Sequence, residues 1–447
     1  MYISKIVLFL MWILTVSGTV FAQEMSPEME AVNSSETETG PVEVSAEIAL
    51  AAEYITENTD RNGRVIYERS LNSHVYLNPT RYNILRHAGT IYAAYLYEMA
   101  CESDSEAWRE MHATRIRLSE YILKNYLHEV TVKTKNPGAK METETETETE
   151  TGAEVEFDSE ADEKAESSVM MSVESKPEEE SLPETQAKLG ASGLALIGMS
   201  NLLPEGRIEP EILRGLGDFV LFMQREDGSF HSKYLYSTGE YDAKFHSSYY
   251  PGEAALGLLY LYDVDPQEKW LQGAKKALFF LAESRKDQEI VREFDHWAML
   301  ATEKLFRMPE NGLSQEERAQ LVFHARQMAF KALPTQILVG EPHEIGSMGG
   351  NISPCSNGTK MEGLISVYHI LEGTGEDELR AEILTALDRL AGFLARAQVQ
   401  EPFLRGGLPS SAGWRIPGVP KKACIVRIDN VQHVLSAWVR YRQIPRD

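Results

Sequence analysis

The strongest constraint on the fold is a repeat of helical segments of two alternating kinds. Hydrophobic residues recur with helical spacing over most of the chain. The spacing predicts helices at 46–58, 83–99, 105–127, 188–201, 209–224, 250–262, 267–285, 295–307, 314–333, 359–372, 376–398 and 429–443. Every second segment is rich in Gly and Ala, as in Gly252-Glu-Ala-Ala-Leu-Gly257, whereas the others carry one charged face. Because small side chains let helices crowd around a centre, we expect six inner and six outer helices.

The connections between these segments alternate as well. Those from an inner helix to the next outer helix are short, and those in the other direction are long except for 286–294. The long ones are 59–82, 128–187, 225–249, 334–358 and 399–428. In a closed ring of hairpins they all lie at the N-terminal ends of the inner helices, where functional loops are expected. The prediction is an all-α fold, an (α/α)6 toroid of six helical hairpins.

This arrangement resembles the (α/α)6 toroid of the six-hairpin glycosidase-like superfamily. Gln224-Arg-Glu-Asp-Gly-Ser-Phe230 and Gly252-Glu-Ala-Ala-Leu-Gly-Leu-Leu259 are similar to hairpin-repeat segments of α/α toroids, including glucuronyl epimerases and terpenoid cyclases. The resemblance is one of architecture over nearly all of the predicted folded residues, without the signature of a particular hydrolase family. It implies a fold, and the chemistry must be argued from the residues.

Three segments are set apart by composition. Residues 1–22 resemble a secretory signal peptide, with Lys5 before an apolar run and a small-residue cleavage site at Val20-Phe-Ala22. We expect a secreted or periplasmic protein without membrane insertion after cleavage, the alternative being an uncleaved anchor. Residues 23–47 hold seven acids and no Lys or Arg, and 129–187 hold eighteen acids and five Lys. Such segments bury too little apolar surface to fold, so both are predicted to be disordered. The toroid domain is then 48–447, interrupted by the insert at 129–187.

The acidic segments also explain the net charge of −24. They carry −7 and −13 and the leader carries +1, which leaves −5 for the remaining residues. An acidic chain without a concentrated basic surface excludes a nucleic-acid partner. A nearly neutral folded part still allows an anionic ligand.

Polar clusters occur where each inner helix begins, so we expect them to surround one cavity. Charged groups, histidines and aromatic faces together suit a carbohydrate, including an anionic one, because helix N-termini favour negative groups. The predicted substrate-binding residues are Arg86, His87, His246, Tyr250, Glu253, His296, Trp297 and Arg427. The predicted catalytic residues are Asp295, Glu362, Asp429 and His433.

Structural roles compete at these positions. Asp295 and Asp429 can cap helices, and Thr359-Lys-Met-Glu362 fits a capping box. Glu253 fits an acidic first turn after a proline. The histidines and Trp297 can belong to the core.

Glycoside hydrolysis needs one protonated and one ionised carboxyl, for which Asp295 and Glu362 are the favoured pair. This hydrolase interpretation is preferred. An epimerase or lyase acting on a uronic acid is the alternative, with Arg86 or Arg427 binding the carboxylate and His433 among the candidate bases. Asp429 and His433, four residues apart, share one helix face. A non-catalytic glycan-binding toroid is the third possibility.

Metals and cofactors are not expected. The four histidines at the helix starts lack metal-ligand spacing, and no dinucleotide or phosphate-loop motif is present.

Cys355 and Cys424 precede consecutive inner helices, so the ring makes them neighbours that a disulfide can join. Cys101 lies on the opposite face and is expected to be unpaired.

Overall fold

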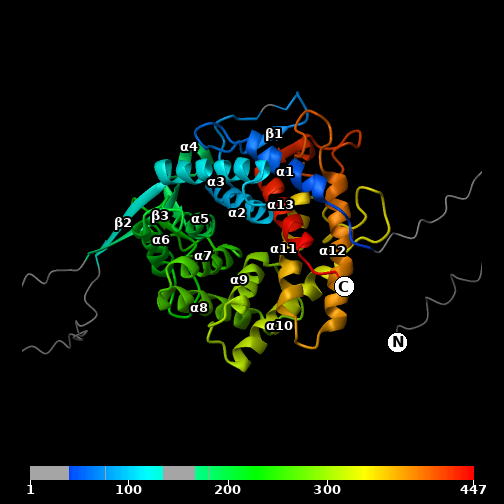
Figure 1. The fold of residues 1–447 in the computed structure, drawn as a ribbon. Coiled ribbons are helices and arrows are strands. Elements are labelled where there is room, and N and C mark those ends of the chain that lie inside the picture. The colour runs from blue at the N-terminus through cyan, green and yellow to red at the C-terminus, as the bar shows by residue number, and fades with distance from the viewer. Residues whose placement is uncertain (1–39, 76, 134–166, 181, 447) are drawn as a thin grey trace, which may run out of the picture. The chain divides into compact units, whose positions relative to one another are not determined.

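A computed structural model describes residues 40–75, 77–133, 167–180 and 182–446. The six inner helices are α2 (Ile84–Ala100), α5 (Leu189–Met199), α7 (Tyr250–Val264), α9 (His296–Arg307), α11 (Pro354–Ile370) and α13 (Ile428–Arg442). Each packs against the next, and α13 packs against α2, so the inner ring is closed (Figure 1). The outer helices are α1 (Ser45–Glu57), α3 (Glu106–Asn125), α6 (Pro210–Phe222), α8 (Glu268–Arg285), α10 (Gln315–Ala332) and α12 (Asp377–Ala397). The predicted (α/α)6 toroid is confirmed.

Small residues allow the close contacts of the inner ring. A Cβ atom on Gly193 of α5 would lie 2.7 Å from the backbone oxygen of Glu253 in α7. A Cβ atom on Gly257 of α7 would lie 2.5 Å from the backbone oxygen of Gly193. Real Cβ atoms do not approach backbone oxygens this closely, so glycine is required on both sides of the α5–α7 contact.

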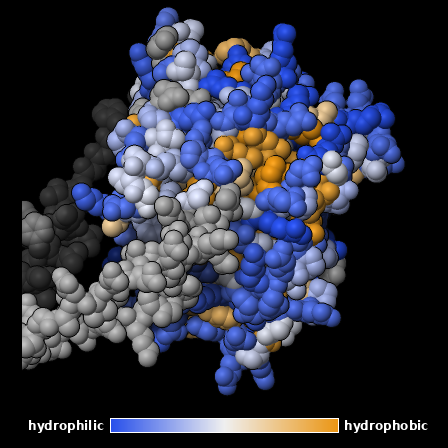
Figure 2. Space-filling model, turned by 90° about the vertical axis from the view of Figure 1, so that its left-hand side faces the viewer, coloured by the Kyte–Doolittle hydropathy of each residue, from blue (hydrophilic) through white to orange (hydrophobic). Residues whose placement is uncertain are grey.

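The outer helices have one buried and one solvated face. In α10, Ser314 and Glu317 form a reciprocal capping box, and buried residues such as Leu321 and Met328 face the ring. Ser105 caps α3 by accepting a hydrogen bond from the backbone of Trp108. On the face drawn in Figure 2, hydrophilic residues predominate and hydrophobic residues gather mainly in one patch. The amphipathic pattern in the sequence therefore corresponds to an apolar side turned toward the inner helices.

Short strands occur within the long connections. Strand β1 (Glu68–Ser70) pairs antiparallel with β7 (Ile425–Arg427), which places Glu68 opposite Arg427. A second sheet has the antiparallel order β2 (Leu127–Lys133), β3 (Ser167–Ser175), β4 (Gln186–Lys188), β5 (Lys233–Leu235) and β6 (Glu240–Tyr241). Strands β4 and β7 run directly into α5 and α13, so both sheets lie at the N-terminal ends of inner helices. The remaining elements are short: α4 (Pro177–Glu180) and 3-10 turns at Ser200–Leu202, Leu333–Thr335 and Lys421–Cys424.

The acidic segments are only partly within the described residues. The predicted signal peptide and residues 134–166 of the predicted insert lie outside them. Ser45 to Glu47, the end of the predicted acidic linker, belong to α1. Both ends of the predicted insert form strands, and β3 packs against α6 with Val173 fully buried. The average composition of 129–187 hid the apolar run Val169-Met-Met-Ser-Val173, which has enough apolar surface to pack.

Among the described helices, none combines the length and the apolar character needed to cross a membrane.

Candidate functional site

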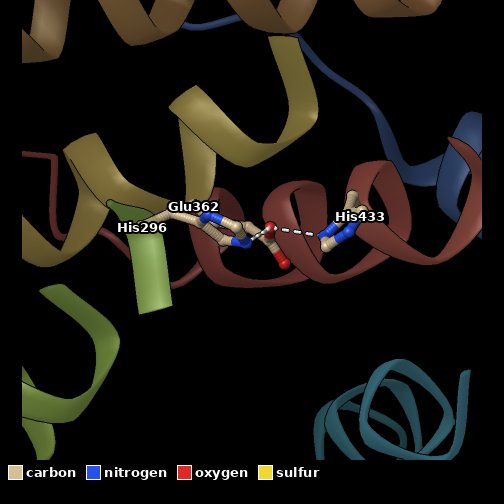
Figure 3. A group of neighbouring side chains, drawn as sticks. All are labelled: His296, Glu362 and His433. Carbon is tan, nitrogen blue, oxygen red and sulfur yellow. Dashed lines mark hydrogen bonds and ion pairs between the residues drawn. The ribbon is translucent and has the colours of Figure 1, made fainter. Parts of the chain in front are cut away.

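Three buried side chains from three inner helices lie next to one another (Figure 3). His296 begins α9, Glu362 lies in α11 and His433 lies in α13. The Nδ1–H group of His433 donates to Oε2 of Glu362 at 2.9 Å, and Nε2 of His296 lies 3.9 Å from the same oxygen. The two imidazole centroids are 5.3 Å apart. One carboxylate oxygen therefore lies between two imidazoles.

Other groups on α13 hold Glu362 in place. The hydroxyl of Ser436 donates to Oε1 of Glu362, and Arg440 donates to its backbone oxygen at 2.9 Å. The Glu362 side chain is 1% exposed. Ser436 and Arg440 were not among the predicted residues, although they follow His433 by three and seven residues on one helix face. That spacing is the signal that could have identified them.

Of the two histidines, His296 is the one whose ring nitrogens lack hydrogen bonds. Neither of its buried ring nitrogens has a hydrogen-bond partner within the described part of the chain. Burial, with smaller electrostatic contributions from the nearby His433 and Arg86, lowers the pKa of His296 well below its usual value. The imidazole is therefore neutral near pH 7. Trp297 is buried with its ring 4.8 Å from that of His296, so it packs behind the histidines.

A second group joins two arginines to one carboxylate. Arg427 donates from Nε to Asp429 Oδ1 at 2.9 Å, and Arg86 Nε lies 3.2 Å from Asp429 Oδ2. Burial raises the pKa of Asp429, but the two arginines outweigh burial and the pKa is lowered overall. The Asp429 side chain is fully buried, whereas those of Arg86 and Arg427 are 37% and 35% exposed. The two arginine side chains are thus partly accessible to solvent, while the carboxylate that pairs with them is buried.

Glu253 in the first turn of α7 is an isolated buried acid. Its Oε2 atom has no hydrogen-bond partner among the described residues. Burial raises the pKa of Glu253 to about 8, against the opposing effect of Arg86. A Cβ atom on Gly190 would lie 1.9 Å from Oε2, and the ring of Tyr250 packs beside the same glycine. At neutral pH this carboxyl is largely protonated.

Asp295 faces the outer helices. Its Oδ1 atom accepts from the backbone of Ala298 at 3.0 Å and so caps α9, and its Oδ2 atom accepts from Arg285 at 2.8 Å. Arg285 in turn lies 3.0 Å from His324 of α10. Both carboxylate oxygens are therefore engaged by structural partners.

Two predicted histidines lie apart from the central trio. His87 is buried, its Nε2–H group donates to the backbone oxygen of Leu118 at 2.9 Å, and its ring stacks on Tyr121. Burial lowers the pKa of His87 to about 4, which keeps it neutral in this core position. His246 is exposed in the connection before α7. The structure therefore gathers His296, Glu362 and His433, and it gathers Arg86, Arg427 and Asp429.

One polar residue at the start of α2 comes from the predicted insert. Glu180 accepts from the backbone of Ile84 at 3.3 Å and from the side chain of Asn83 at 3.4 Å, and it pairs with Lys188. It therefore neutralises Lys188 and caps an inner helix. Nothing in its acidic surroundings distinguished Glu180 from the other acids of the insert.

The cysteines are all free, so the predicted disulfide between Cys355 and Cys424 is not formed. Cys355 lies in the first turn of α11, with Sγ 3.9 Å from Asp429 Oδ2. Cys424 Sγ instead lies 3.8 Å from the backbone oxygen of Trp414. The ring brings the two loops to one face but directs the thiols to different partners. Cys101 is unpaired, as predicted.

Two groups among the described residues have the donor atoms for a metal ion. Those of His296, Glu362 and His433 lie within 4.8 Å of one another, and two histidines with one glutamate form a known zinc ligand set. Glu362, however, already accepts from His433 and Ser436. In the second group, Glu98, His112 and Glu205, the guanidinium of Arg115 contacts both carboxylates at 2.7 and 2.6 Å. The absence of a metal remains a prediction.

Comparison with known proteins gives similarity at the level of the fold. No protein-family model and no curated protein match the sequence. A sugar epimerase from a ruminal bacterium is 11% identical, with 90% of this chain and 99% of that chain covered at a TM-score of 0.54. Cellobiose 2-epimerase from Bacillus thermoamylovorans B4167 is 11% identical, with 87% and 95% covered at a TM-score of 0.52. The cellulase Cel9M of C. cellulolyticum is 9% identical, with 90% and 98% covered at a TM-score of 0.49. The two epimerase structures, with TM-scores above 0.5, show that the similarity is one of fold.

Proposed function

We propose that this chain is a carbohydrate-processing enzyme that moves a proton at a carbon next to a sugar carbonyl, as an epimerase or isomerase does. The observation that carries the proposal is the convergence of His296 and His433 on one oxygen of Glu362, at 3.9 and 2.9 Å. Two imidazoles from different helices can serve as base and acid on one substrate. Histidine is suited to both roles near neutral pH.

The proposed reaction needs no oxidant, reductant or second substrate. His296, neutral in the free protein, takes the proton from the carbon beside the carbonyl of an open-chain sugar, and the electron pair of that C–H bond forms an enediolate. His433 supplies a proton to the enediolate, and return to the opposite face of the carbon gives the epimer. Glu362 fixes the orientation of His433 and stabilises positive charge on it when it is protonated.

The surrounding groups support an anionic intermediate. Arg86 and Arg427 are partly exposed beside the trio, and their positive charge favours a developing oxyanion. The fold accommodates such chemistry, since two of the similar structures are by name a sugar epimerase and a cellobiose 2-epimerase. The fold alone does not assign the reaction, which rests here on the histidines.

Glycoside hydrolysis, the function preferred from the sequence, is the second candidate. It is favoured by the contrast between Glu253, whose pKa is raised to about 8, and Asp429, whose pKa is lowered. A protonated and an ionised carboxyl are the two states that hydrolysis requires. The pair preferred from the sequence is less suitable, because the oxygens of Asp295 and Glu362 are engaged by their neighbours.

Product analysis separates the candidates. The protein is incubated with a panel of aldoses and oligosaccharides, and epimers of unchanged mass are distinguished from shorter cleavage products by chromatography. We expect the wild-type protein to form epimers, and we expect His296→Gln and His433→Gln to abolish their formation. The control variant His74→Ala, at an exposed histidine, should still form epimers. Cleavage products lost in Glu253→Gln would instead establish hydrolysis. Binding without turnover in the wild type would establish a glycan-binding toroid.

We also propose export through residues 1–22, which places the enzyme in a secreted or periplasmic compartment. The composition of these residues supports the proposal. N-terminal sequencing of the mature protein should begin at Gln23, and recovery of Met1 in the mature chain would contradict export by cleavage.

A further inference from the structure

A cavity of about 400 Å³ lies on the β1–β7 sheet, where strand β7 leads into α13. Its polar lining consists of Glu68, Arg81, Ser410, Ser411, Lys422 and Arg427. Arg427 lies at the end of β7, opposite Glu68 across the two strands. Because Arg427 also binds Asp429, the cavity and the arginine–carboxylate group of the candidate site share one side chain.

The charges at this cavity do not cancel. Glu68 accepts from Arg81 with both carboxylate oxygens at 3.1 Å, so this pair is neutral. Asp429 neutralises one of the two arginines that contact it, Arg86 or Arg427. Lys422 has no ion-pair partner among the described residues. The four cations Arg81, Arg86, Lys422 and Arg427 therefore exceed the two carboxylates Glu68 and Asp429 by two charges, in a chain whose net charge is −24.

Most of these cations are accessible. The Arg81 side chain is 54% exposed and lies over the ring of Tyr67, which holds the guanidinium over the sheet. Lys422 is exposed, and Arg427 is about one third exposed. The hydroxyl of Ser411 accepts from the backbone of Gly413 at 3.2 Å and keeps its own proton to donate. A planar guanidinium, an ammonium and a hydroxyl in one cavity are the groups that bind carboxylates and phosphates.

We infer that this cavity is a subsite for an anionic group of the sugar, so that the substrate is an acidic saccharide bound with its charged unit between Lys422, Arg81 and Arg427. This assignment rests on the proposed function for the reacting end of the sugar, at the neighbouring histidines. Carboxylate and phosphate share the chemistry that these side chains recognise. The Nε and Nη2 atoms of Arg427 already bind Asp429, so Arg427 adds positive charge at the cavity, whereas Lys422 is free to bind either group as a point charge.

Three matched probes test the subsite: a neutral glucose disaccharide and its derivatives with a carboxylate or a phosphate on C6 of the non-reducing unit. Calorimetric titration of the full chain at low salt should show at least one acidic probe binding about tenfold more tightly than the neutral disaccharide, as a charge-assisted contact implies. The advantage should shrink as salt is added, because exposed charges are screened. Whichever acidic probe gains affinity identifies the anion.

The variants Lys422→Ala and Arg81→Ala should each remove most of this advantage and leave the neutral disaccharide unchanged. The control is Lys421→Ala, an adjacent exposed lysine outside the cavity lining, which should retain the advantage. Equal binding of all three probes, or an advantage that survives both variants, would overturn the subsite.

The result is independent of proton transfer. If the neutral disaccharide is epimerised and no acidic probe gains affinity, the subsite fails and the proposed function stands. If an acidic probe binds in the expected way and no sugar is epimerised, the subsite stands and the proposed function fails.

Discussion

Replacing Glu362 by glutamine tests whether this carboxylate positions His433. Glutamine has nearly the same shape, so the packing around this fully buried position is preserved. The variant removes the negative charge that accepts from His433 at 2.9 Å and lies 3.9 Å from His296. A hydrogen bond to a charged group contributes about 1.5–3 kcal/mol. If that stabilisation is used in the transition state, its loss lowers the proton-transfer rate roughly 10- to 150-fold.

The measurement is the steady-state rate of epimer formation for wild type and Glu362→Gln on the same sugar. We expect kcat to fall with KM little changed, because Glu362 orients a catalytic group and does not reach the substrate. Glu317→Gln is the control, since glutamine preserves the capping box that Glu317 forms with Ser314 on the outer helix α10. A folded Glu362→Gln protein with the wild-type rate would refute the positioning role. A change confined to KM would point to substrate contact instead.

The remaining predictions concern charge and metal at the site. Because burial raises the pKa of Glu253 from 4.5 to about 8, the folded chain retains a proton that the unfolded chain loses. Stability should therefore fall between about pH 4.5 and 8 by on the order of 1.4 kcal/mol per pH unit, and thermal unfolding of Glu253→Gln should lack this slope. Asp429 has a lowered pKa, so its contribution is present above the ordinary carboxyl range and is lost as the pH falls through the lowered value. Asp429→Asn should cost on the order of 3 kcal/mol in unfolding free energy at pH 7, because Arg86 and Arg427 lose their counter-charge; an unchanged unfolding curve would contradict the pairing. Epimer formation should survive EDTA dialysis, whereas a loss restored by Zn²⁺ would place a metal on the histidine–glutamate trio.

The ring of helices could be predicted from the sequence because its cause is local. Small-residue and amphipathic segments alternate along the chain, and glycines such as Gly193 and Gly257 indicate where two inner helices, α5 and α7, are in close contact. The ordered ends of the predicted insert could not be predicted. The pairing of β3 with β2 and with β4 depends on contacts across the long connection, and a short apolar run was outweighed by the acids around it.

The sequence indicated where the candidate residues lie in the fold, but not which neighbours their side chains contact. Equivalent helix ends place Arg86, His296, Glu362, Asp429 and His433 on one face, which periodicity can show. Side-chain direction depends on neighbours that are distant in the sequence. Asp295 points toward the outer helices because it forms an ion pair with Arg285 of the preceding outer helix. His87 turns toward α3 because the backbone oxygen of Leu118 is available. The residue spacing within one helix does not indicate either partner, because Arg285 and Leu118 belong to other helices.

Solvent isotope exchange tests the central claim most directly. Wild-type protein is incubated in D2O with the sugar on which epimers are found, and proton NMR follows the hydrogen on the carbon beside the carbonyl. The proposed mechanism predicts that deuterium enters this position as the epimer forms, and that His296→Gln and His433→Gln each abolish the exchange. An epimer without deuterium, or full exchange in both variants, would contradict proton transfer by the two histidines.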